Sequence, residues 1–172
     1  MSDIVRDMEK YRRGWTGGLP ETPCGFGSTI SQTRIQRAWL PRMVEKYDIR
    51  SISDIGAGDM NWIELINWPH SVEYKPFDLV PRRPEVVEFD IVQEVPERAD
   101  CLMCLWVLNH LPEDHARTAM GHFRASGSEY LIYTYEPRQW ACTNIEAMES
   151  VVIRDRGAKD KRGNVELRLA RL

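Results

Sequence analysis

The stretch "SISDIGAGDMNW" at residues 51–62 decides the fold. It starts with a short run suited to a strand and continues into Gly56 and Gly58, which stand between two acids, Asp54 and Asp59. A glycine at the exit of a strand permits a positive φ and a close approach of the backbone to a ligand. In a parallel sheet this exit lies at the carboxyl edge, where ligands bind. The stretch therefore predicts the first strand of such a sheet with a ligand site behind it.

Strands and helices alternate around this stretch, which predicts a parallel sheet with right-handed crossovers. The run "ADCLMCLWVL" is apolar almost throughout, as expected of a central strand covered on both faces. Pro41 and Pro76 are expected to kink or interrupt the segments that contain them. The expected strands are 49–55, 71–79, 85–91, 99–108 and 128–136, the expected helices are 28–48, 60–68 and 112–126, and an antiparallel hairpin is expected from 149–156 and 164–172.

The residues after the glycines indicate which kind of ligand fits. The dinucleotide fingerprint G-x-G-x-x-G lacks its third glycine here, and Asp59 directly after Gly58 disfavours a pyrophosphate. That acid suits a ligand that also carries a cation, such as the amino and sulfonium groups of S-adenosylmethionine (SAM). The N–H groups at the start of the helix expected over 60–68 suit a carboxylate or a phosphate. A plain tight turn explains the two glycines equally well.

Two further acids end the next two expected strands. Asp78 lies roughly twenty residues past the glycines, where an acid takes both ribose hydroxyls of a nucleoside. Asp90 and Ile91 end the third strand, where an adenine amino group and ring face can be met. As structural alternatives, Asp78 forms the turn before "VPRRP" and Asp90 caps its strand. Acids at three successive strand ends favour a nucleoside site more than any one of them alone.

On these motifs the chain resembles a class I (Rossmann-like) SAM-dependent methyltransferase over residues 28–172. "SISDIGAGDMNW" resembles the first motif of that family, "FDLVP" its ribose-binding acid and "EFDIVQEVP" its adenine-binding segment. "ADCLMCLWVLNHLP" resembles the fourth strand with the active-site segment beyond it, and "SEYLIYTY" resembles the fifth strand. The resemblance implies a three-layer α/β methyltransferase fold with a mostly parallel seven-stranded sheet, SAM as cofactor and S-adenosylhomocysteine (SAH) as product.

A narrower likeness concerns the residues before the first motif. "GFGSTISQTRIQRAWLP" resembles a group of small methyltransferases of bacteria and their phages. It implies that Gly25, Gly27, Ser28 and Thr29 form a nest of N–H and hydroxyl donors near the cofactor carboxylate. Alternatively, Ser28 or Ser31 caps the following helix.

The resemblance divides the chain into two parts. Residues 1–30 hold a short helix and a Gly-rich loop, and Trp15 with Arg12 and Arg13 is a candidate lid over the cofactor. Residues 31–172 form the SAM-binding domain. The expected cofactor-binding residues are Gly27, Ser28, Thr29, Asp54, Gly56, Ala57, Gly58, Asn61, Trp62, Asp78, Leu79, Asp90, Ile91, Leu105 and Trp106.

The candidate acceptor site follows the fourth strand, at "WVLNHLP". His110 is placed to take a proton from the acceptor, and Asn109 to orient it. Tyr135 ends the fifth strand on the rim of the same cleft. Packing or capping explains each of these residues equally well. The chain has neither a D/N-P-P-Y/F/W tetrad nor a Pro-Cys pair, so no local motif supports nucleic-acid base methylation. The acceptor stays open between a small molecule and an exposed polymer site.

Composition restricts the remaining classes. The 172 residues, 42% of them hydrophobic, fit one globular domain, with no apolar run that suits a membrane helix and no secretory signal at the start. Cys101 and Cys104 form a C-x-x-C inside an apolar run, which favours buried thiols in a reducing, cytoplasmic compartment, and no metal is expected. The net charge is −3, with an acidic middle between basic ends. That pattern fits an anionic substrate or ordinary solvated faces.

Other functions can use the same pocket. A lyase or hydrolase that breaks SAM down is one alternative, because the segment between the fifth strand and the hairpin leaves little room for a substrate domain. A SAM-binding protein without catalytic activity is another. A nicotinamide oxidoreductase is a more distant possibility.

Overall fold

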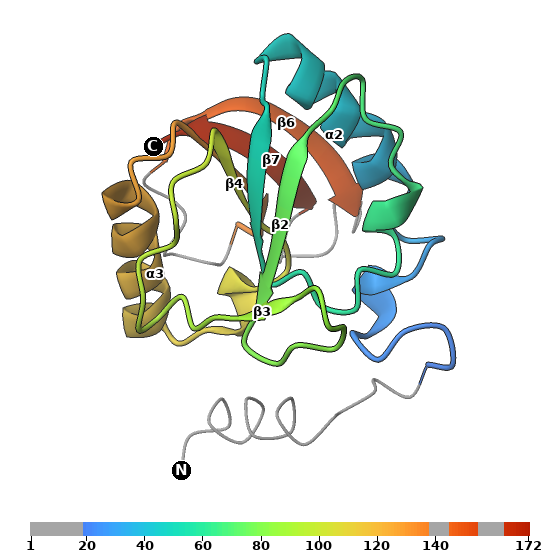
Figure 1. The fold of residues 1–172 in the computed structure, drawn as a ribbon, viewed down its shortest axis with the longest axis horizontal. Helices are drawn as coiled ribbons and strands as arrows, with labels where there is room; N and C mark the ends of the chain where they lie inside the picture. The colour runs from blue at the N-terminus through green and yellow to red at the C-terminus, as the bar shows by residue number, and fades with distance from the viewer. Residues whose placement is uncertain (1–18, 138–144, 155–163) are drawn as a thin grey trace.

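A seven-stranded sheet in the order β3-β2-β1-β4-β5-β7-β6 forms the centre of the protein (Figure 1). The computed structural model describes residues 19–137, 145–154 and 164–172. Strands β1 to β5 pair in parallel, whereas β7 pairs antiparallel with both β5 and β6. The strands are β1 (Ser51–Ile55), β2 (Glu73–Asp78), β3 (Val87–Glu88), β4 (Cys101–Cys104), β5 (Tyr130–Tyr135), β6 (Ala147–Arg154) and β7 (Val165–Arg171). The predicted mostly parallel sheet with a C-terminal antiparallel hairpin is confirmed.

In the described part of the chain, α2 (Arg34–Lys46) and α3 (Glu113–Ala125) lie on opposite faces of the sheet, which gives three layers (Figure 1). Alternate residues of the strands point to opposite faces, so the sheet shares two apolar clusters with the helices. On β4, Cys101 and Met103 join the cluster under α2, whereas Leu102 and Cys104 join the cluster under α3. This double burial is the physical reason for the continuous apolar run, and the predicted burial of the Cys101 and Cys104 thiols is confirmed.

The helix expected over 60–68 is not formed. The structure has only the short 3-10 helix η2 (Ile63–Leu65) there. Met60 has a φ of 58°, a left-handed conformation that cannot continue a right-handed helix, and Trp62 stands at the N-cap of the 3-10 turn. The expected helix N-terminus behind the glycines is therefore absent, and the argument that it would hold a carboxylate is wrong.

The helix expected over 28–48 starts later than predicted. Residues before Arg34 form the 3-10 helix η1 (Phe26–Ser28) and turns, and α2 runs through Pro41 without restarting there. Apolar side chains on both sides of Pro41, such as Leu40 and Val44, are fully buried and hold the helix against the sheet. Burial of these side chains outweighs the local cost of a proline inside the helix.

Strand β2 likewise continues through Pro76, while β3 is shorter than expected. Pro76 pairs with Asp54 of β1 on one side, and β3 pairs only with Phe77 and Asp78, so the other side of β2 has no strand partner at Pro76, although the residue itself is buried. Strand β3 stops at Glu88. Two residues later the Asp90 carboxylate accepts a bond from the Val92 N–H at 2.9 Å and turns the chain.

Hydrogen bonds from side chains join β1 and β4 at the edge of the sheet where both strands begin. Asp100 Oδ2 accepts bonds from the N–H groups of Arg50 and Ser51 at 2.8 and 2.9 Å. The Asp100 N–H donates in return to the Ser51 hydroxyl at 2.8 Å. These three bonds fix the relative position of the two central strands at the amino edge, opposite the glycine turn.

No helix within the described ranges is long and apolar enough to cross a bilayer.

Candidate functional site

The turn after β1 has the backbone that its two glycines predict. Gly56 and Gly58 adopt φ values of 97° and 62°. The N–H groups of Gly56 and Ala57 donate to the Phe77 carbonyl at 2.8 and 3.0 Å, and the Gly58 N–H donates to Asp78 Oδ2 at 2.8 Å. The turn is thus fixed to the end of β2, and these three N–H groups bind the protein itself instead of a ligand anion.

Asp78 is buried beside the turn, only 6% exposed. Besides the Gly58 N–H, its carboxylate accepts a bond from the Val80 N–H at 2.9 Å. Burial raises the pKa of Asp78, while these two backbone bonds act to lower it. The turn-forming alternative for Asp78 therefore holds. It leaves ribose binding open, because each carboxylate oxygen can accept a second bond.

Asp54 lies at the carboxyl end of β1, only 5% exposed. The Tyr74 hydroxyl on β2 donates to its Oδ2 atom. Burial raises the pKa of Asp54 to about 7, the Tyr74 bond opposes this shift, and the nearby Asp78 charge adds to it. Tyr74 belongs to no sequence motif, so the sequence did not predict it as a site residue. Nothing in the residues around it indicates its hydrogen bond to Asp54.

The loop before α2 lies against the glycine turn. Glu21 Oε1 accepts bonds from the Ile30 N–H at 2.6 Å and from Asn61 Nδ2 at 2.9 Å, and Asn61 also donates to the Ser28 carbonyl at 3.1 Å. A Cβ atom added to Gly58 would lie 2.8 Å from Cys24 Sγ. The structure thus brings Ser28 and Asn61 together.

Three of the donors that were expected in this loop are already engaged. The N–H groups of Ser28 and Thr29 donate to Gly25 and Phe26 carbonyls, and the Thr29 hydroxyl donates to the Phe26 carbonyl at 3.0 Å. The expected nest at Gly25, Gly27, Ser28 and Thr29 is therefore not preformed. The capping alternative is also wrong, since the N-cap residue of α2 is Thr33, and no side chain makes a cap bond there.

The residues directly after β4, Leu105 to Val107, pack against the glycine turn and the loop before α2. Leu105 is buried, in agreement with a core role, and Trp106 has a φ of 58° and packs partly against the same cluster. A Cβ atom added to Gly27 would lie 3.7 Å from the Trp106 ring, and one added to Gly56 would lie 2.1 Å from Val107 Cγ2. Left-handed backbone at large residues such as Met60 and Trp106 is uncommon and is concentrated at functional sites.

The three expected catalytic residues lie at the ends of β4 and β5. Asn109 and His110 belong to the 3-10 helix η3 (Leu108–His110). The Asn109 Oδ1 atom is buried without a hydrogen-bond partner in the described part of the chain. Tyr135 ends β5, and the Arg168 guanidinium stacks on its ring, 3.3 Å from the centroid. Because β4 and β5 are parallel neighbours, these residues share one edge of the sheet with the glycine turn.

The remaining expected cofactor residues divide between the core and the edge. Ile91 is buried in the cluster under α3, and its carbonyl lies 2.7 Å from His122 Nδ1. Asp90 caps the end of its strand, in line with the structural alternative. Ala57 and Trp62 pack partly against the α2 cluster, and Leu79 is half-buried directly after β2. The candidate lid residues Arg12, Arg13 and Trp15 and the expected helix at 3–13 lie outside the described residues.

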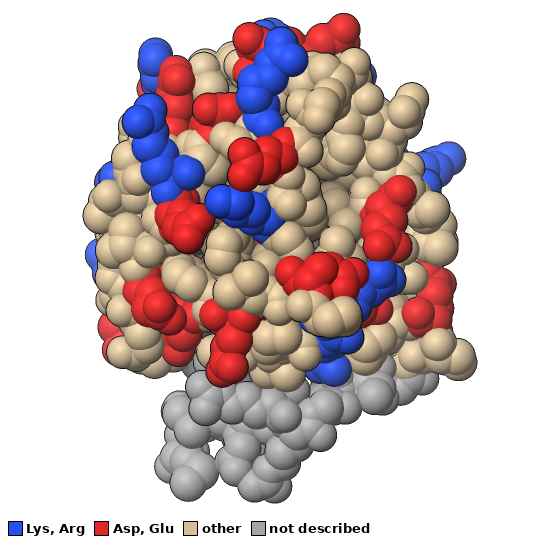
Figure 2. Space-filling model, viewed as in Figure 1, with Lys and Arg blue, Asp and Glu red and all other residues tan. Residues whose placement is uncertain are grey.

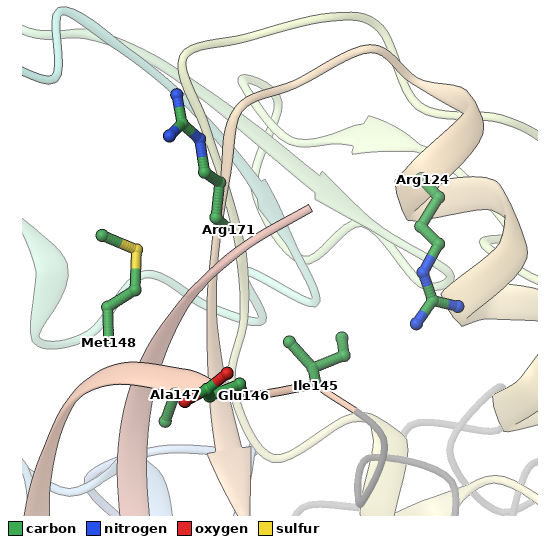
Figure 3. Close-up of a pocket in the computed structure, with 6 residues that line it drawn as sticks. All are labelled: Arg124, Ile145, Glu146, Ala147, Met148 and Arg171. Atoms are coloured by element: carbon green, nitrogen blue, oxygen red, sulfur yellow. The ribbon is translucent and has the colours of Figure 1, made fainter.

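A separate depression of about 440 Å³ lies at the opposite edge of the sheet (Figure 3). Its lining consists of Arg124, Ile145, Glu146, Ala147, Met148 and Arg171. Arg171 is opposite Tyr130, the first residue of β5, so this hollow is at the amino edge and apart from the glycine turn. Figure 3 shows Arg124 reaching from α3 toward Ile145.

Acidic and basic side chains are interspersed on the face of the protein that carries β2 and β3 (Figure 2). This face therefore offers no uniformly basic surface of the kind that binds a nucleic-acid backbone.

Known proteins resemble this chain in structure and not in sequence. No protein-family model and no curated protein matches it by sequence. Magnesium protoporphyrin IX methyltransferase from Synechocystis PCC 6803, solved with bound SAM, matches with a TM-score of 0.66 and 13% identity, over 99% of this chain and 97% of that chain. The chain has the class I methyltransferase fold.

Two further structures support this assignment of the fold. A SAM-dependent methyltransferase of the DUF858 family from Leishmania major has a TM-score of 0.64 and 10% identity, over 98% of this chain and 87% of that chain. The methyltransferase domain of bacterial CtHen1 has a TM-score of 0.60 and 11% identity, over 84% of this chain and 100% of that domain. At these identities the comparisons establish the fold alone, and the narrower likeness to bacterial and phage methyltransferases stays a prediction.

Proposed function

We propose that this protein is a SAM-dependent methyltransferase that transfers a methyl group to a small molecule or an exposed polymer site and releases SAH. The observation that carries the proposal is a buried carboxylate at the carboxyl edge of the sheet, Asp54, which has no ion-pair partner among the described residues. A buried, unbalanced negative charge is costly, and the ammonium group of SAM would balance it.

The other edge residues fit the nucleoside end of the same cofactor. The Asp78 carboxylate can accept bonds from both ribose hydroxyls on the lone pairs that Gly58 and Val80 leave free. Asp90, beyond β3, would meet the adenine amino group. Because Gly56 and Gly58 carry no side chain, Val107 and Cys24 can pack directly against the turn, at positions where a Cβ atom would collide with them. Support also comes from the fold, which this chain shares with magnesium protoporphyrin IX methyltransferase, solved with SAM and with SAH, and with the SAM-dependent methyltransferase from Leishmania major.

SAM supplies a methyl group on a sulfonium, so the leaving group needs no further activation. The chain has to align the acceptor with the methyl carbon and exclude water. The acceptor's lone pair forms the new bond to carbon while the carbon–sulfur pair returns to sulfur. When the acceptor carries a proton, His110 would take it, with Asn109 and Tyr135 orienting the acceptor.

Calorimetry with SAM and SAH tests cofactor binding, and incubation with methyl-labelled SAM and fractionated acceptor pools tests transfer. We expect both ligands to bind and label to appear in one acceptor fraction. Absence of binding to either ligand, with a thermal shift by NADH instead, would overturn the proposal. Rapid loss of SAM without any acceptor would indicate a degrading enzyme, and tight binding without turnover a non-catalytic protein.

A further inference from the structure

We propose that Tyr74 is a positioning residue for the cofactor: its hydroxyl group keeps the Asp54 carboxylate ionised and directed toward the ammonium group of SAM. This inference rests on the proposed function, because it gives Tyr74 a role at the same SAM site. Tyr74 does not touch the cofactor in this proposal and acts only through Asp54.

Strand pairing brings the two side chains together. In the parallel register of β1 and β2, Ile52 lies opposite Tyr74 and Asp54 lies opposite Pro76. The Tyr74 pair is therefore two residues before the Asp54 pair, which places both side chains on the same face of the sheet. Its hydroxyl donates to Asp54 Oδ2, and its ring packs against the apolar cluster under α2. The packed ring fixes the direction from which the hydroxyl approaches the carboxylate.

The surroundings of Asp54 are negative or apolar. Asp78 at the end of β2 acts on it with a like charge, and the buried Cys101 thiol of β4 is close enough for its pKa to be raised in part by Asp54. The α2 side chains of this cluster, Trp39, Leu40, Met43 and Val44, are apolar. Tyr74 is thus the one described group that stabilises the ionised form of Asp54.

Charge on Asp54 depends on this hydrogen bond. Burial raises the pKa of Asp54 to about 7, and the Tyr74 bond acts in the opposite direction. Without the hydroxyl, the pKa would rise further and the carboxyl group would be mostly protonated at neutral pH. A protonated Asp54 offers no charge to an ammonium group, so SAM affinity should follow the ionised fraction of Asp54.

The test is the SAM dissociation constant of the wild type and of Tyr74→Phe from about pH 5.5 to about 7.5, compared as the ratio of the two constants, because the loss of a proton from the α-amino group of SAM near the upper end affects both proteins equally. Wild-type affinity should rise with pH, by close to tenfold per unit well below the Asp54 pKa. Loss of a bond to a charged group corresponds to roughly one pKa unit, so Tyr74→Phe should bind about tenfold more weakly near pH 6 and about threefold more weakly near pH 7.5.

Tyr47→Phe is the matched control. The Tyr47 hydroxyl also donates to a carboxylate, Glu149 Oε1 at 2.8 Å, but this pair joins α2 to β6 at the surface. Removing it should leave both the affinity for SAM and its pH dependence unchanged.

The outcomes separate this inference from the proposed function. A loss of affinity in Tyr74→Phe by the same factor at every pH would make Tyr74 merely structural and overturn the inference. If Tyr74→Phe fails to fold, Asp54→Asn carries the test: a pH dependence that persists in it would overturn the inference as well. No binding by the wild type at any pH would instead remove the proposed function itself.

Discussion

Replacing Gly56 by alanine tests the requirement for glycine at the turn after β1. At a φ of 97° any other residue is strained by about 1–2 kcal/mol. The added Cβ would lie 2.1 Å from Val107 Cγ2, a distance at which one of the two atoms must move. Overpacking of this kind costs about 1–3 kcal/mol. Gly56→Ala should therefore lower the free energy of unfolding by about 2–5 kcal/mol.

Gly121→Ala is the matched control for this substitution. Gly121 lies on the exposed side of α3, and a Cβ atom added there meets nothing within 4 Å. Alanine in a helix interior should raise the stability by about 1 kcal/mol. In a chain of this size each kcal/mol moves Tm by about 2–4 °C, so thermal unfolding followed by circular dichroism should show Tm lowered by about 4–20 °C for Gly56→Ala and raised slightly for Gly121→Ala.

The double variant Gly56→Ala/Val107→Ala identifies the source of the loss. Removing Val107 Cγ2 relieves the close contact, while the strain of the positive φ remains. The two changes should therefore couple, with the double variant more stable than the sum of the single effects. A Gly56→Ala protein with wild-type Tm, or strict additivity with Val107→Ala, would refute the reasoning.

Three further predictions concern titratable groups near the turn. The Asp54 pKa is about 7 in the folded protein, against an ordinary value of 3.8, so the stability of the wild type should fall as pH rises between these two values. Asp54→Asn should remove this pH dependence of the stability. From about pH 5 to about pH 8 the wild type should lose about 2–3 kcal/mol relative to Asp54→Asn in urea titrations, and equal pH slopes would contradict the raised pKa. Asp78→Ala should weaken SAM binding by about 1–3 kcal/mol in calorimetry, and unchanged affinity would remove Asp78 from the site. Burial raises the pKa of the Cys24 thiol to about 11, so iodoacetamide near neutral pH should alkylate Cys24 far more slowly than free cysteine; peptide mass spectrometry that finds equal rates would contradict this.

The strands could be predicted because their signals are local. A central strand covered on both faces must be apolar throughout, as Cys101–Cys104 is, and the terminal hairpin follows from two alternating segments near the end of the chain. The helix over 60–68 does not form because Met60 at its expected start is left-handed and the chain becomes extended again at Ile66, and no pattern of apolar spacing reports these backbone angles. The start of α2 was misplaced because Thr29 forms a turn of its own before the helix.

In the candidate site, only the residues at the ends of strands could be predicted from the sequence. Spacing along the chain places Asp54, the glycines and Asp78 at one edge of a parallel sheet, and the Gly58–Asp78 bond confirms that the turn and the second acid meet. Tyr74 and Val107 reach the same place through strand register and loop folding. Contacts of that kind depend on three-dimensional packing, so a single sequence gives no sign of them.

The bonds between Asp100 and the start of β1 have a consequence for variation in this protein. The register of the two central strands is set by side chains at the end of the sheet remote from the glycine turn. Loops at the carboxyl edge of the sheet can then change in length or composition while β1 and β4 keep their register. A library of variants confined to the segments after β4 and β5 should consequently yield mostly folded proteins, which makes this scaffold suited to a search for new acceptors.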